Sequence, residues 1–166
     1  NWKNYLTIAS GLYPPGDKVI VERAKNAVQI FPNNSDIKNL LNSVSVGRKQ
    51  MIEAVEASKI ALEYFNSNEF EKAAIEFEKA IKLNSADYSN YENAAIANYM
   101  TGNLYKAIEQ IDKVINDMNP LNGKCEYIKA LIFIKLGDHV GACPLLATSR
   151  DSGNTQASGI FDQYCR

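Results

Sequence analysis

The chain has 166 residues, of which 46% are apolar and 22% charged, and its 18 Lys and Arg residues nearly balance 19 Asp and Glu residues. This composition is that of a folded globular domain, so disorder is excluded, and without a net basic field no nucleic-acid partner is expected. No uninterrupted apolar run approaches the roughly 20 residues that cross a bilayer, so no transmembrane segment is expected.

Residues 1–53 have the pattern of degenerate helices. Helical apolar spacing over 1–12 ends at the Pro-Pro-Gly motif that follows, because proline and glycine interrupt helices. A second helix is expected over 17–32, and a third begins at Asp36. The third helix either stops or bends and runs into the next helical segment, and a break near Gly47 is favoured. The apolar side chains that carry these helices include Trp2, Tyr5, Ala24, Ala27, Leu40 and Leu41.

From Ala54 onward, small and bulky apolar residues recur at a fixed interval. Ala73 and Ala107 are 34 residues apart, Ala107 and Ala142 are 35 apart, and each follows a polar or glycine-containing turn. The apolar spacing is helical on both sides of each turn, so each unit is a helical hairpin. A single hairpin cannot bury its apolar face alone, so the hairpins must stack on one another.

These units resemble the tetratricopeptide repeat (TPR) family, a 34-residue helical hairpin with small, aromatic and glycine residues at fixed positions. The resemblance implies an all-α fold, a TPR-type superhelix of antiparallel hairpins with three repeats over 54–87, 88–121 and 123–153. The matching residues are Ile60, Ala61, Tyr64, Ala73, Phe77 and Ala80 in the first unit, Tyr91, Ala94, Ala95, Gly102, Ala107 and Ile111 in the second, and Ala130, Phe133, Gly137, Ala142 and Leu146 in the third.

Two features mark the C-terminal end of the array. Pro144 lies about six residues into the second helix of the third unit, where a kink or a late helix start is expected because proline lacks the backbone donor. Residues 154–165 carry Ala157, Ile160 and Phe161 at helical spacing, which is typical of the terminal capping helix that repeat arrays need.

The cysteines are Cys125, Cys143 and Cys165, and His139 is the single histidine, so neither a metal site nor a cofactor is expected. If two antiparallel helices meet at a turn near Gly153, Cys143 and Cys165 fall nearly opposite each other. They are then within the roughly 4.4–6.8 Å between Cα atoms that a disulfide requires. The alternative is two buried thiols that pack as small apolar residues.

The run from Leu136 to Cys143, followed by the closing Tyr164 and Cys165, is similar to the last repeat of exported TPR proteins of the Bacteroidota. This resemblance implies an oxidising periplasmic or outer-membrane-associated location, with a cytoplasmic location as the alternative. The chain begins at Asn1 without an initiating Met, so we expect a processed mature form or a fragment of a longer protein.

Catalysis is not expected, because one histidine provides no nucleophile and base set, and the Glu cluster over 69–78 is typical of a solvated helix face. In the TPR family the first helix of each hairpin lines a concave groove. By register, the residues implied to contact a partner are Leu62, Phe65, Asn66, Glu92, Asn93, Ile96, Tyr99, Met100, Lys124, Tyr127 and Leu131, and the same register places Val55, Ser58 and Lys135 along the groove. Only Asn93 and Lys124 match the family's set for clamping a terminal carboxylate, so that specialised function is disfavoured.

The sequence therefore predicts a non-enzymatic scaffold or adaptor that binds a protein or peptide partner through this groove, as a subunit of a larger complex. Two alternatives remain open. The N-terminal helices, with Trp2, Tyr5, Leu40 and Leu41, could fill the groove themselves. The chain could also be a structural spacer or homo-oligomerisation segment of a longer protein, with no peptide bound.

Overall fold

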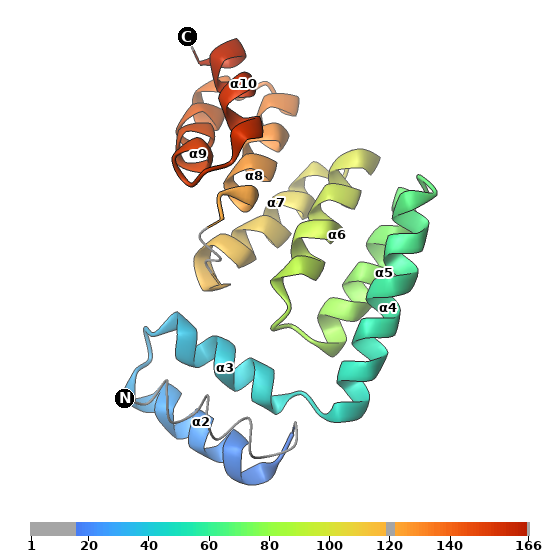
Figure 1. Ribbon diagram of the computed structural model, residues 1–166, viewed down its shortest axis with the longest axis vertical. Coiled ribbons are helices and arrows are strands. Elements are labelled where there is room, and N and C mark those ends of the chain that lie inside the picture. Colours follow the sequence, from blue (N-terminus) through green and yellow to red (C-terminus); the bar gives the residue numbers. More distant parts are fainter. Residues whose placement is uncertain (1–15, 119–121, 166) are drawn as a thin grey trace.

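The structure, a computed structural model, describes residues 16–118 and 122–165, and these residues fold into helices with no strand among them (Figure 1). The all-α prediction is thereby confirmed for this part of the chain. The predicted helix over 1–12, with Trp2 and Tyr5, lies outside the described residues. The helices are α2 (Lys18–Ile30), α3 (Ser35–Ser45), α4 (Arg48–Asn66), α5 (Phe70–Leu83), α6 (Tyr88–Thr101), α7 (Leu104–Lys113), the π-helical turn η1 (Val114–Met118), α8 (Lys124–Lys135), α9 (His139–Asp151) and α10 (Thr155–Tyr164).

From α4 to α10, each helix packs on the one that follows it, and α6 also packs on α8. The same turn recurs between paired helices, because Asn68, Gly102, Gly137 and Gly153 all have positive φ. Gly102 ends α6 in the left-handed conformation, where its amide donates to the carbonyls of the last helical turn. Short turns of this kind place consecutive helices side by side, which produces the row of hairpins seen in Figure 1.

The core of this row alternates small and large side chains. Fully buried alanines let neighbouring helices approach closely, and Phe77, Ile111 and Leu146, each 0% exposed, fill the space between hairpins. Burying one such side chain stabilises the fold by roughly 1.5–3 kcal/mol. The alanines at 0% exposure include Ala61, Ala73, Ala80, Ala94, Ala95, Ala107, Ala130 and Ala142.

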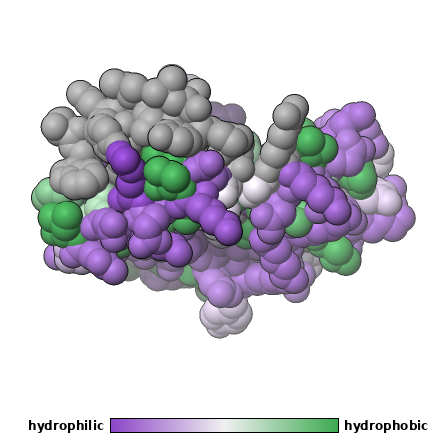
Figure 2. All heavy atoms as spheres, turned by 90° about the horizontal axis from the view of Figure 1, so that it is seen from below, coloured by the Kyte–Doolittle hydropathy of each residue, from purple (hydrophilic) through white to green (hydrophobic). Residues whose placement is uncertain are grey.

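The α2–α3 hairpin is set apart from the row. Its own core is built from Ile20, Ala24, Ala27, Ile37 and Val44, and α3 packs on α2 and η1 rather than along α4. Leu40 and Leu41 pack into this same core, so they do not fill the groove predicted on the later helices. Figure 2 views the molecule from below relative to Figure 1, and the surface seen there is largely hydrophilic, with separate apolar patches.

The predicted break near Gly47 is confirmed, since α3 ends at Ser45 and Gly47 is the residue before α4. Of the two outcomes predicted at Pro144, a kink or a late helix start, the late start does not occur, because α9 begins at His139 and contains the proline. The carboxylate of Asp138 accepts a hydrogen bond from the Gly141 amide at 2.8 Å, and this cap stabilises the first turn ahead of the proline.

The last helix, α10, packs on α9 and is tethered to it. The sulfur atoms of Cys143 and Cys165 are 2.08 Å apart and their Cα atoms 5.6 Å apart, in agreement with the predicted pairing. The ring of His139 stacks on that of Tyr164, with centroids 5.1 Å apart, and the Arg150 guanidinium lies over Phe161. Within the described ranges, no helix has the length and apolarity needed to span a bilayer.

Candidate partner-binding face

The residues predicted to contact a partner lie on α4, α6 and α8, and polar contacts join these three helices. Between α4 and α6, the Ser58 hydroxyl donates a hydrogen bond to Asn90 Oδ1 at 2.7 Å. The Asn90 amide in turn donates to Asp87 Oδ2 at 3.2 Å, just before α6 begins. These bonds fix the side of α4 that borders α6.

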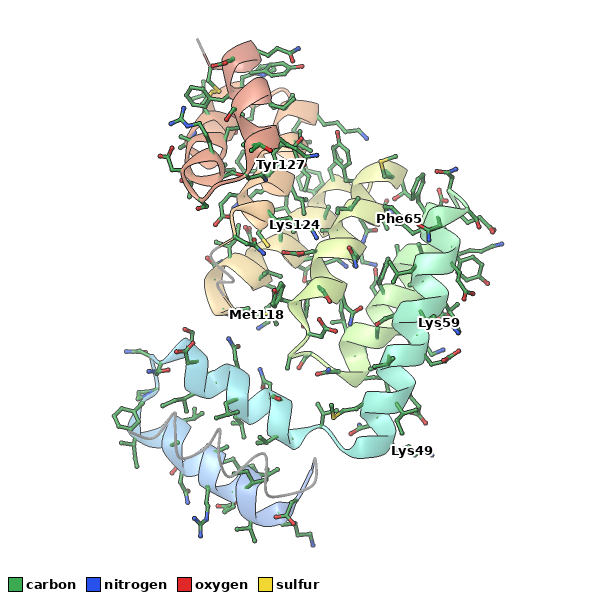
Figure 3. All side chains as sticks on the ribbon, in the orientation of Figure 1. Lys49, Lys59, Phe65, Met118, Lys124 and Tyr127 are labelled. Atoms are coloured by element: carbon green, nitrogen blue, oxygen red, sulfur yellow. A yellow bond between two sulfur atoms is a disulfide. The ribbon has the colours of Figure 1, made fainter. Side chains whose placement is uncertain are left out.

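Glu92 makes the corresponding contact between α6 and α8. Lys124, labelled on α8 in Figure 3, donates from Nζ to Glu92 Oε2 at 2.6 Å, and the Cys125 thiol donates to Glu92 Oε1 at 3.3 Å. Glu92 is 2% exposed, so its carboxylate lies beneath the surface with both oxygens occupied. Burial raises the pKa of the Cys125 thiol strongly, and the charge of Glu92 and the hydrogen bond to it add to this effect. Cys125 is therefore a neutral donor.

A second link between α6 and α8 involves Tyr99 and Lys135. The Lys135 ammonium donates to the Tyr99 carbonyl oxygen at 2.9 Å and lies 4.4 Å from the centroid of the Tyr99 ring. The lysine thus caps the end of α6 and makes a cation–π contact at the same time. Together with the pair at Glu92, it holds α6 and α8 at both ends of their contact.

The open side of this face carries apolar side chains. Val55, Ser58 and Leu62 share one face of α4, because they are three and then four residues apart. This face borders α6, because Ser58 donates a hydrogen bond to Asn90 of α6. Even so, Val55 is 69% exposed and Leu62 is 45% exposed. On α6, Met100 directly follows Tyr99 and is 48% exposed. Exposed apolar residues on adjacent helices are what a partner can bury.

The predicted set divides by exposure into three groups, which decides how each residue can act. Leu62, Asn66 and Met100 are exposed, and Glu92 is buried. The remaining residues are half-buried, so each packs against the protein and still exposes part of its side chain. Phe65, for example, meets the ring of Phe70 edge to face, with centroids 5.2 Å apart. The half-buried members are Phe65, Asn93, Ile96, Tyr99, Lys124, Tyr127 and Leu131.

Sequence reasoning missed Asn90 and Cys125, which connect the helices under the face. The signal was available as spacing, since each lies 32 or 33 residues after its partner, Ser58 or Glu92, in the preceding unit. Polar residues that recur at nearly one repeat length are candidates for contacts between hairpins. No cluster of His, Cys, Asp and Glu suited to a metal ion occurs in the residues that the structure describes.

No protein-family model matches the chain, and no curated protein matches it either.

Proposed function

We propose that the chain is a TPR-type scaffold that binds an extended or helical segment of a partner protein along α4, α6 and α8. The observation that carries this proposal is the exposure of Val55, Leu62 and Met100, together with the half-buried aromatic residues Phe65, Tyr99 and Tyr127 of the same predicted set. Apolar and aromatic side chains of this kind concentrate binding energy in a few residues of an interface. The residue pattern of the three hairpins and their sequential packing support the family assignment.

The polar links favour a preformed face. Because Ser58, Glu92, Tyr99 and Lys135 already hold the helices together, the partner does not need to order them when it binds. A preorganised surface loses less conformational entropy on binding than a mobile one. Glu92 and Lys124 act within this support, and the partner contacts are assigned to the other residues of the predicted set, which are exposed or half-buried.

An exported location is part of the proposal and is supported by the bond between Cys143 and Cys165. Disulfides persist in oxidising compartments such as the periplasm and cell surface and are rare in the cytosol. Cys125, the free thiol of the described residues, is 1% exposed and paired with Glu92, which protects it from oxidation there.

The test uses peptides selected from a displayed random library on the purified chain. Their affinity is compared between wild type, the double variant Leu62→Asp, Met100→Asp, and the control Ile75→Asp. Ile75 is 64% exposed on α5, outside the proposed face, so its substitution reproduces the change in charge and hydropathy of one of the two substitutions. We expect at least a tenfold loss for the double variant and no loss for the control. Equal affinities, or no selectable peptide, would favour the spacer alternative.

A further inference from the structure

A separate pocket of about 500 Å³ lies away from the proposed binding face, between α5, α7 and η1. It is lined by Ile81 of α5, Tyr91 of α6 and Gln110 of α7, among others. Its volume is within the range of small-molecule sites, roughly 300–1,000 Å³. The π-helical turn contributes Asn116 and Asp117 to the wall, and such turns are frequent at functional sites.

Two polar groups of the pocket lack hydrogen bonds that their chemistry permits. Tyr91 is 8% exposed, and its hydroxyl makes no hydrogen bond to any described residue. Gln110, also 8% exposed, accepts from Asn98 Nδ2 at 3.0 Å through Oε1, which leaves its NH₂ group without a partner among those residues. In the described part of the chain, no fully buried side-chain nitrogen or oxygen lacks a partner. Tyr91 and Gln110 both line the pocket, so their donors are the ones considered for a bound ligand.

The charged residues around the pocket are mostly paired with each other. Lys106 Nζ lies 2.6 Å from Glu78 Oε1, Lys113 pairs with Asp117, and Lys129 of α8 lies 2.5 Å from Asp112 Oδ1. Lys82 and Glu109, of opposite charge, complete the charged lining. Positive and negative charges around the pocket nearly balance, so neither a cationic nor an anionic ligand is favoured.

We propose that this pocket binds a small uncharged molecule with an apolar body and a carbonyl acceptor. The apolar body packs on Ile81 and the Tyr91 ring, and the carbonyl oxygen accepts a hydrogen bond from Tyr91 Oη, with the Gln110 NH₂ group as a second donor of the pocket. A carbonyl oxygen has two lone pairs, so it can accept more than one hydrogen bond. Leaving a hydrogen-bonding group of the site without a partner costs affinity, so ligands without an acceptor bind more weakly.

The test titrates the wild-type chain with three probes of similar size, N-methylbenzamide, benzoate and benzylammonium, and follows backbone amides by NMR. We expect N-methylbenzamide to shift the signals of Ile81, Tyr91 and Gln110 and to bind at least fivefold more tightly than either charged probe. Equal binding of the three probes, or no shift at these residues with N-methylbenzamide, would overturn the proposal.

A conservative variant tests the hydrogen bond itself. Tyr91→Phe keeps the ring and removes the hydroxyl, and we expect it to weaken N-methylbenzamide binding about five- to tenfold. The matched control is Tyr105→Phe, because Tyr105 is on α7 and is 82% exposed, outside this pocket. Unchanged affinity in a folded Tyr91→Phe variant contradicts the proposal. If that variant does not fold, the ranking of the three probes on the wild-type chain decides.

Discussion

Glu92 on α6 and Lys124 on α8 form an ion pair in which one partner is buried and the other reaches water. The Glu92 side chain is 3% exposed and the Lys124 side chain 45% exposed, with Nζ and Oε2 2.6 Å apart. Because the carboxylate is satisfied from within the chain, Lys124 is not free to receive a carboxylate from a partner. The pair therefore stabilises the scaffold, and the proposed partner face depends on the apolar residues beside it.

This asymmetry predicts unequal effects of removing the two partners. Lys124→Met leaves a buried carboxylate with only the Cys125 thiol as donor, so we expect a loss of about 1–3 kcal/mol in the free energy of unfolding. Glu92→Gln leaves an ammonium that solvent can reach, so we expect a smaller loss. Equilibrium urea unfolding of both variants and the double variant measures the difference. Equal losses would contradict the asymmetry.

Alkaline stability reports on Cys125. Its pKa in the folded chain is raised above the ordinary value of 9.0, so the folded state keeps its proton at a pH where the unfolded state loses it. The stabilisation is complete below pH 9.0 and falls as the pH rises, by up to about 1.4 kcal/mol per pH unit. Compared with Cys125→Ser, which retains a donor to Glu92, wild type should lose more stability between about pH 8 and pH 10.5. Parallel pH profiles would rule this out.

The hairpins after Ala54 were predictable because their helices follow from local signals, namely small residues in register and turns that break them. The contacts of the N-terminal helices were not. The break at Gly47 is a local feature, whereas the docking of α3 near η1 depends on distant residues. At Pro144 the late helix start did not occur, and the hydrogen bond from the Gly141 amide to Asp138 caps the helix before the proline. Glu92 was predicted to contact a partner in the groove, but it is buried and accepts hydrogen bonds from Lys124 and Cys125. The position of a residue within the repeat does not reveal such contacts.

The disulfide should make α10 sensitive to reductant. The bond between Cys143 and Cys165 spans 22 residues, and closing such a loop stabilises the fold by about 3 kcal/mol. We expect dithiothreitol to lower the unfolding free energy by a similar amount and to speed hydrogen exchange first in α10. The double variant Cys143→Ala, Cys165→Ala is the control, and its stability should not respond to dithiothreitol. An unchanged wild-type unfolding curve in reductant would contradict this role.

Gly123 tests the packing between the start of α8 and α9. It has φ +69°, and a Cβ atom there would lie 2.7 Å from the carbonyl oxygen of Ser149, whose hydroxyl donates to the Gly123 carbonyl at 2.6 Å. Gly102, at φ +84°, has nothing within 4 Å of the same position. Both Ala variants carry backbone strain, but Gly123→Ala should cost about 1–3 kcal/mol more because of the clash. Thermal unfolding compares them, and similar midpoints would show that α9 yields without cost.

The most direct measurement of the central claim is an NMR titration of the chain with a library-selected peptide. We predict that the largest shifts fall on α4, α6 and α8, around Leu62, Ile96 and Met100. Shifts confined to α5, α7 and η1 would instead place the peptide at the pocket beside Tyr91. That result, or shifts confined to α9 and α10, would contradict partner binding through the face that the first helices of the hairpins form.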